Sequence, residues 1–404
     1  MDVNENPAIG LSEHYIALSA ADEALIVWGQ QNPSSLRSRR KPRTGPWAAE
    51  LSIPAPVGAS EGIWDAVMVQ SADGTAIERW QQSCASNCTL DNPASCWISH
   101  FDPMRGWGDA TRVAEWCGLS RYPVAANSKG DFVISYYNES TSPRELTVVP
   151  YLAGKLGTAQ VMTTATEDTF DENRLNLHLR DDRTVTATYF LGDALFHKEG
   201  SAQSQWGLAT RVAEVPSCEK RGACELRTVF DQAGDVTIVW TQKIDGSSSM
   251  REIWFVQRSD GQWGGSAKLA DEDVSGHFGV GGNPRGDVVV AYAAMVAPDL
   301  PTELRILHYT KTEGWVRQEL PVAKVAAAEP SVGISPEGHA VAAWMTFTDD
   351  RFDVWSSQAT GNEWTSPQRI DMQADSFDLV VGVDISMVAV SHYTTGKYSV
   401  VQLD

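Results

Sequence analysis

Seven ionisable side chains recur along the sequence at nearly constant spacing, and they are the residues best placed to do chemistry. The chain has 32 Lys and Arg, 52 Asp and Glu and 8 His among 404 residues, so fewer than a quarter of its positions can ionise. An ionisable residue at every one of the seven positions is therefore not expected by chance. The seven positions are Glu13, Asp65, Arg121, Arg174, Glu225, His277 and Glu329.

The types of these residues suggest two kinds of chemistry. Arg121 and Arg174 belong to neighbouring copies of a repeat, and two guanidinium groups suit bidentate capture of a carboxylate, sulfate or phosphate. The acidic residues form a second sector, in which paired carboxyl groups with separated pKa values could act as general acid and base. Candidates for moving protons are Glu225, His277 and Glu329. The alternative is that these charges are solvated, or paired with one another, at the mouth of a water-filled channel.

The repeat is marked by an aromatic residue near the end of the second strand of each copy. These aromatics are separated by 52, 56, 53, 51, 52 and 52 residues, and each ionisable position lies 15 residues before one of them. The aromatics are Trp28, Trp80, Tyr136, Tyr189, Trp240, Tyr292 and Trp344. A degenerate eighth copy ends near His392, and there Asp375 or Asp378 falls near the place of the ionisable residue.

The repeated unit predicts an all-β fold. Its segments alternate with period two and are rich in Val, Thr, Tyr and Trp, whereas helical periodicity is nearly absent. A unit of four antiparallel strands cannot bury both faces alone, so we expect the units to stack around an axis as blades of a β-propeller. In such a fold the first strand of each blade lines the central channel. The seven ionisable positions are therefore predicted to surround one mouth of that channel.

Eight second strands predict eight blades in a single domain spanning residues 1–404. The last copy ends after its third strand, and the segment Asn4–Ser12 would supply the missing strand and close the ring from the N-terminus. Seven blades with a spare hairpin is the alternative.

The glycine turn, the Val-rich strand and the closing Trp strand of the repeat resemble bacterial exported β-propellers, which are distantly similar in fold to sialidase-type propellers. The resemblance covers nearly the full length of the chain. No repeat contains the motif Ser-x-Asp-x-Gly-x-Thr-Trp that marks many sialidase-like blades. The resemblance therefore implies the fold and not sialidase chemistry.

The net charge of −20 narrows the possible partners. A chain this acidic repels phosphate backbones and anionic lipid, so we expect it to bind neither nucleic acid nor membrane surfaces. No apolar run approaches the roughly 20 residues that span a bilayer. The N-terminus lacks the basic and apolar regions of a leader, so the protein is either cytosolic or begins after a removed leader.

The cysteines favour export. Four of them lie within one repeat, and the other two flank a short loop; the six are Cys84, Cys88, Cys96, Cys117, Cys218 and Cys224. Their even number and tight grouping indicate local disulfides in an oxidising compartment, with the pairing left open. A zinc site is the rival interpretation, but the paired knuckles that zinc favours are missing. Such disulfides would either make the loops of the mouth rigid enough to bind a ligand or protect long insertions from proteolysis.

Two further charged stretches carry weaker signals. The basic run Leu36–Arg43 is predicted on an outer strand and turn of the first blade, where it either meets an acidic partner or guards a solvated edge. Asp349, Asp350 and Asp353 could hold calcium, although the glycine-bearing loop pattern is missing. The sequence contains no HExxH motif and no nucleophile elbow.

We therefore expect a secreted, periplasmic or cell-surface recognition protein that binds a glycan, peptide or protein through its loop face and charged mouth. It is predicted to be a monomer without a cofactor, a metal or membrane insertion. The alternative is a hydrolase or lyase acting on an anionic sugar, held by Arg121 and Arg174. A purely structural role is the third possibility.

Overall fold

The computed structural model describes residues 14–31, 34–55, 63–82, 95–115, 117, 123–138, 140–165, 175–215, 224–244, 250–295, 302–321, 327–348, 351–392 and 397–403. These residues form 35 β-strands and no helix. The predicted all-β fold is confirmed. Within the described part of the chain, no helix is long and apolar enough to cross a membrane.

The chain divides into two compact units. The first comprises Met1–Leu191, His197–Thr210 and Tyr393–Ser399, and the second comprises Gly192–Phe196, Arg211–His392 and Val400–Asp404. The single domain over residues 1–404 and the number of blades stay predictions.

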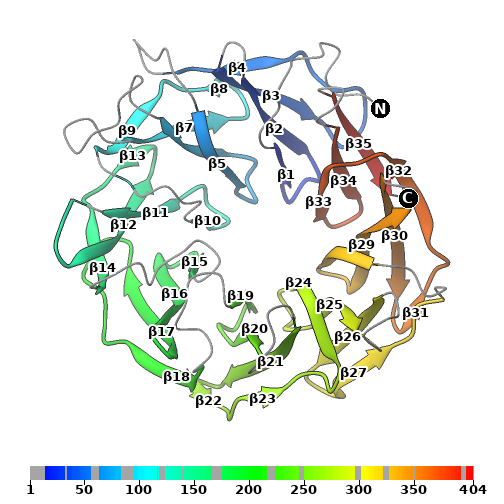
Figure 1. Cartoon of the computed structure of the whole chain (residues 1–404). Coiled ribbons are helices and arrows are strands. Elements are labelled where there is room, and N and C mark those ends of the chain that lie inside the picture. Colours follow the sequence, from blue (N-terminus) through cyan, green and yellow to red (C-terminus); the bar gives the residue numbers. More distant parts are fainter. Residues whose placement is uncertain are drawn as a thin grey trace. The chain divides into compact units, whose positions relative to one another are not determined.

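The first unit contains three antiparallel sheets and a further strand pair, which follow one another in chain order (Figure 1). The first sheet has β1 (His14–Leu18), β2 (Ala24–Gln31), β3 (Ser34–Lys41) and β4 (Leu51–Ile53). The second has β5 (Ile63–Gln70), β6 (Ala76–Gln82), β7 (Ser95–Asp102), β8 (Gly106–Trp107) and β9 (Thr111–Ala114). The third has β10 (Val124–Ala126), β11 (Phe132–Asn138), β12 (Arg144–Leu152), β13 (Lys155–Leu156) and β14 (Gln160–Ala165). The pair is β15 (Leu175–Leu179) with β16 (Thr184–Leu191).

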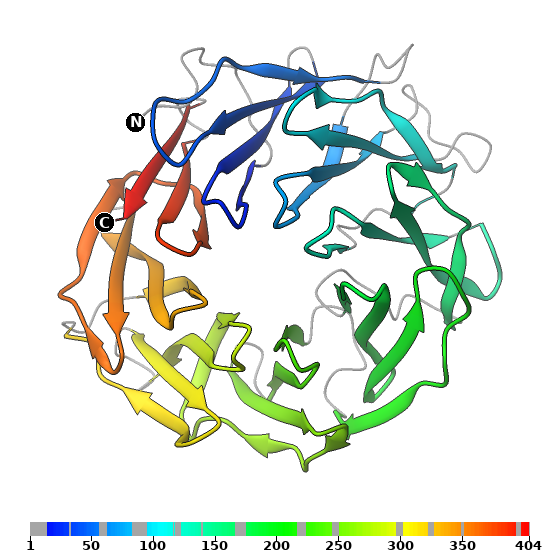
Figure 2. The ribbon, with the colours of Figure 1, turned by 180° about the vertical axis from the view of Figure 1, so that it is seen from behind.

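The second unit continues the same pattern, as the reverse view in Figure 2 also shows. One large sheet has β19 (Glu225–Phe230), β20 (Val236–Lys243), β21 (Met250–Ser259), β22 (Gln262–Trp263), β23 (Ala267–Lys268), β24 (Asp273–Gly282), β25 (Val288–Met295), β26 (Glu303–Thr310) and β27 (Gly314–Gln318). The next has β28 (Ala327–Ile334), β29 (His339–Thr348), β30 (Arg351–Thr360), β31 (Glu363–Trp364) and β32 (Gln368–Met372). A pair, β33 (Ser376–Val381) with β34 (Ser386–His392), follows. The remaining strands are β17 (Ala194–Ser201), β18 (Thr210–Glu214) and β35 (Lys397–Leu403).

All eight predicted second strands are present as strands, and the repeat aromatics lie within them. These strands are β2, β6, β11, β16, β20, β25, β29 and β34. The seven aromatics are between 0% and 8% exposed, so they are core residues. Burial of apolar surface is the main favourable contribution to the folding free energy, and large aromatic side chains each bury much of it.

Neighbouring sheets pack face to face inside each unit. In the first unit, Val27 of β2 and Trp80 of β6 share one apolar cluster. In the second, Ile306 of β26 packs with Val332 of β28 and Trp344 of β29. At these two places a sheet therefore buries a face against its neighbour, as the repeat predicts.

Glycines allow the first strands of neighbouring sheets in the second unit to approach very closely. A Cβ atom on Gly281 of β24 would lie 2.8 Å from the Cα atom of Gly333 in β28 and 2.9 Å from the carbonyl oxygen of Val332. A Cβ atom on Gly279 would lie 2.8 Å from the carbonyl oxygen of Pro330. Only glycine fits these places, because the atoms it meets belong to the backbone.

Side chains in the turns between first and second strands link neighbouring repeats at three places within the two units. Ser71 Oγ donates to the carbonyl oxygen of Asn127 at 2.6 Å, and Asn127 Nδ2 donates to the carbonyl oxygen of Arg180 at 3.3 Å. In the second unit, Asn283 Nδ2 donates to the carbonyl oxygen of Ser335 at 3.2 Å. All five residues hold the same place in their turns, where the N–H group donates to the carbonyl oxygen four residues later. The turns therefore form a relay of hydrogen bonds within each unit.

Candidate functional site

The structure describes four of the seven predicted ionisable positions. Asp65 belongs to the first unit, whereas Glu225, His277 and Glu329 belong to the second. The other three, Glu13, Arg121 and Arg174, lie outside the described residues, as does the segment Asn4–Ser12 predicted to close the ring. The polarised ring around one mouth stays a prediction.

Three of the four positions lie in β-bulges at the same place in their first strands. Bulges of this kind redirect a side chain and are frequent next to functional sites. Asp65 and Glu329 also have φ angles of 49° and 47°, in the left-handed region that residues other than glycine rarely adopt. The bulges lie between Trp64 and Val67, between Val274 and Phe278, and between Ala328 and Ser331.

Glu225 and His277 form the centre of the cluster in the second unit. Glu225 Oε2 lies 3.2 Å from His277 Nδ1, and Glu225 Oε1 accepts a hydrogen bond from Arg227. The backbone N–H group of Glu225 donates to Thr241 Oγ1 at 3.3 Å. The side chain of Glu225 is only 8% exposed, whereas that of His277 is 68% exposed. A buried carboxylate therefore orients an imidazole that faces solvent.

The pKa values of the pair move apart. The hydrogen bond with Glu225 raises the pKa of His277 above 6.5 against the opposing effect of burial, and the negative charges of Glu225 and Glu329 add to the rise. Burial acts to raise the pKa of Glu225, but the hydrogen bond with His277 and the charges of Arg227, His277 and Arg251 outweigh it and lower that pKa below 4.5. The effect of Glu329 on His277 brings the third predicted residue into the same electrostatic cluster.

These pKa shifts define the pH range over which the pair stabilises the folded state. Because the pKa of His277 is raised, its contribution is complete below pH 6.5 and is lost as the pH rises through its folded-state pKa. Because the pKa of Glu225 is lowered, its contribution is complete above pH 4.5 and is lost as the pH falls through its folded-state pKa. The pair therefore contributes most between pH 4.5 and pH 6.5.

We expect the substitution Glu225→Gln to lower the pKa of His277, because the neutral amide removes the main charge that favours the imidazolium form. Titration of the His277 ring protons by NMR measures this pKa directly. Glu252→Gln is the matched control, since Glu252 contacts Lys268 and Trp254. An unchanged His277 titration in Glu225→Gln would contradict the ion pair.

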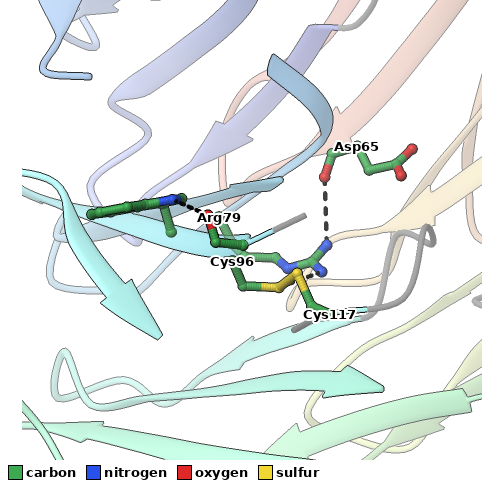
Figure 3. The surroundings of a disulfide bond; sticks show 6 residues. Asp65, Arg79, Cys96 and Cys117 are labelled. Carbon is green, nitrogen blue, oxygen red and sulfur yellow. Dashed lines mark hydrogen bonds between the residues drawn. A yellow bond between two sulfur atoms is a disulfide. The ribbon is translucent and has the colours of Figure 1, made fainter. Parts of the chain in front are cut away.

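A second constellation surrounds Asp65 in the first unit (Figure 3). Arg79 of β6 is fully buried, and its guanidinium group donates to the carbonyl oxygen of Asp65 at 3.5 Å. The same group lies 3.4 Å from the Sγ atom of Cys96, which is bonded to Cys117. The side-chain carboxylate of Asp65 points away from Arg79 in this view. The guanidinium group thus ties the bulge of β5 to the disulfide.

The expectation of local disulfides is confirmed for part of the cysteine set. Cys96 at the start of β7 is bonded to Cys117, 21 residues later. Cys224 is also disulfide-bonded. The other three cysteines, Cys84, Cys88 and Cys218, lie outside the described residues.

The basic run does not occupy an outer strand. Strand β3 contains most of the run and pairs with β2 on one side. On its other side, Leu36–Ser38 pair with the short strand β4, so β3 is not the outermost strand of the sheet. Arg40 forms an ion pair with Glu23 and donates to the carbonyl oxygen of Pro103 at 2.9 Å. Arg40 is therefore engaged within the fold.

The possible calcium site gains no support from the described residues. Asp353 lies 3.5 Å from the guanidinium group of Arg369, and Asp349 and Asp350 lie outside the described part. Within that part, no group of three His, Cys, Asp or Glu side chains could hold a metal ion.

A polar cavity of about 210 Å³ lies at the other end of β28 from Glu329. The turns of two neighbouring sheets line it, with Glu337, His339 and Asp384 among the polar residues and Ile385 and Leu403 among the apolar ones. It is separate from the predicted cluster.

Two arginines of these constellations were not singled out from the sequence. Arg227 follows Glu225 by two residues, so the period of a strand places both on one face, and its guanidinium group lies 6.0 Å from the ring centre of Phe278. Arg79 is a charged residue in the otherwise apolar second strand of its repeat. This departure from the repeat pattern could have marked Arg79 as a candidate functional residue.

No protein-family model matches the chain, and no curated protein matches it either. Solved structures do resemble it. A polysaccharide lyase, an ulvan lyase, is 9% identical with a TM-score of 0.52 and covers 98% of this chain and 93% of its own. A prolyl endopeptidase is 13% identical with a TM-score of 0.54 and covers 96% of this chain and 55% of its own, so this chain spans about half of that protein. The β-propeller domain of the Trilobed protease from Pyrococcus furiosus is 10% identical with a TM-score of 0.49, over 84% of this chain and 95% of that one.

These likenesses concern the fold alone. The two with TM-scores above 0.5, together with the succession of antiparallel sheets that pack face to face, confirm the predicted β-propeller fold.

Proposed function

We propose that the protein is a recognition propeller without turnover, which binds a glycan at the cluster of Glu225, His277 and Glu329. The observation that supports this proposal is the repeated bulge, which brings ionisable side chains to the same end of successive first strands. Glu329 is exposed and His277 is 68% exposed, so both remain accessible to a ligand. Carboxylates accept hydrogen bonds from sugar hydroxyl groups, and a protonated imidazole donates to their oxygen atoms.

A peptide or a protein partner would use the same accessible groups and is the alternative ligand class. We further propose a monomer of eight blades in one domain, closed by the N-terminal segment and located outside the cytoplasm. The Cys96–Cys117 disulfide supports an oxidising compartment.

The binding proposal is tested on a glycan array, followed by calorimetry on the sugars that are retained. We expect His277→Ala and Glu329→Gln each to weaken binding roughly tenfold, the usual effect of removing a central contact. Glu313→Gln, in the exposed turn between β26 and β27, is the control and should bind like the wild type. Retention of full affinity in both site variants would contradict the proposed site.

The second candidate function is a glycan-active hydrolase or lyase, and the oriented imidazole of His277 is the observation that favours it. Its Nδ1 atom is held by a buried carboxylate, an arrangement that also orients catalytic bases. Release of reducing ends or unsaturated products from uronic- or sialic-acid polymers would support turnover, provided that His277→Ala abolishes it.

A further inference from the structure

An exposed aromatic ring lies one strand away from Glu329 in the same sheet. It is on the face of that sheet that packs against β34, whereas the sheet that carries His277 packs against the other face. Phe347 lies near the end of β29 and is 53% exposed. It pairs across the hairpin with Phe352 of β30, and their ring centroids are 5.1 Å apart at an interplanar angle of 54°. Phe352 itself packs against the apolar core between β30 and β34. The exposed ring is thus supported from behind by a fixed one.

The strand register fixes how far this ring lies from the charged cluster. Ala327 of β28 pairs with Thr346, and the bulge that contains Glu329 lies opposite Trp344. Phe347 is therefore one strand away from Glu329 and three residues further along, which corresponds to a backbone separation of about 11 Å. An oligosaccharide of three or more rings that passes over the end of the sheet covers this span, but one or two sugar rings do not.

The surroundings of Phe347 favour a sugar over a protein partner. Alternation along the strands places Met372 on the opposite face of the sheet, because it pairs with Asp353 rather than with Phe352. Among the described residues, the large exposed apolar side chains other than Met372 lie outside this sheet, so Phe347 is not part of a broad apolar patch. A protein interface needs such a patch at its centre.

We propose that Phe347 is a stacking platform for one pyranose ring of an oligosaccharide whose other end is held at Glu329 and His277. The apolar C–H face of a pyranose matches the area of one aromatic ring, and its hydroxyl groups stay in water at the edge. This inference rests on the proposed glycan binding and adds the requirement for an extended chain.

The test compares disaccharide and hexasaccharide members of the β-1,4-glucan, β-1,4-xylan and α-1,4-galacturonan series by isothermal titration calorimetry. In whichever series the wild type binds, we expect Phe347→Ala to weaken hexasaccharide binding roughly three- to tenfold and to leave disaccharide binding unchanged. Phe347→Trp should retain the hexasaccharide affinity. Leu208→Ala, which removes a side chain that is 95% exposed, is the control for loss of surface apolar area.

The outcomes separate this inference from the proposed function. If Glu329→Gln weakens binding but Phe347→Ala does not at either chain length, the platform is wrong and the glycan site stands. Equal losses at both lengths also contradict the platform, since a disaccharide at Glu329 does not reach it. If the wild type binds no oligosaccharide of these three series, both the proposed platform and the proposed glycan site are wrong for these sugars.

Discussion

Replacing Gly281 with alanine is expected to lower the free energy of unfolding by about 3 kcal/mol, the upper part of the usual cost of overpacking. The new Cβ atom would lie 2.8 Å from the Cα atom of Gly333 and 2.9 Å from the carbonyl oxygen of Val332. Neither atom belongs to a side chain that could rotate away, so β24 and β28 would have to separate. Urea denaturation followed by tryptophan fluorescence measures the change.

Gly265→Ala is the matched control, because a Cβ atom there would meet nothing within 4 Å and the residue has no positive φ. This variant should be neutral or slightly more stable, since alanine reduces the freedom of the unfolded chain. A Gly281→Ala variant that unfolds within about 0.5 kcal/mol of the wild type would show that the two first strands do not approach as described.

Loss of the Cys96–Cys117 disulfide is expected to cost about 3 kcal/mol of unfolding free energy, the loop-closure value for a separation of 21 residues. Both cysteines are buried, so alanine leaves little new exposed surface. The measurement compares urea denaturation of Cys96→Ala, Cys117→Ala and the double variant with that of the wild type.

The double variant provides the internal control. Each single substitution already breaks the bond, so the double variant should be about as unstable as either single one. Destabilisation that adds up across the two sites would mean that the cysteines contribute independently, and the cross-link would then be ruled out as the cause.

The fold followed from the sequence because its signals are local. Each repeat has a buried aromatic residue in its second strand, a turn before that strand and apolar residues that alternate with period two. These three features lie within a few residues of one another in the sequence. The structure accordingly has a strand at each of the eight predicted places, from Trp28 to His392.

The site followed only in part, because its geometry depends on contacts between repeats. The common place of Glu225, His277 and Glu329 was visible as spacing, since one repeat later in the sequence means the first strand of the next repeat. The bulges were not visible, because a bulge is a mismatch between two strands rather than a property of one. The preference of His277 for Glu225 over Glu329 likewise depends on the backbone path around each residue.

The relay of turn hydrogen bonds has a consequence for how such a chain can change its length. Ser71, Asn127 and Asn283 all donate to a main-chain carbonyl group, so the accepting residue can be of any type. A duplicated repeat inserted between two others therefore brings its own turn carbonyl group, which can accept the hydrogen bond. After deletion of a repeat, the turn carbonyl group of the following repeat can accept it instead. Gene-level gain or loss of a whole repeat would leave this connection intact, whereas a change at the donor would break it.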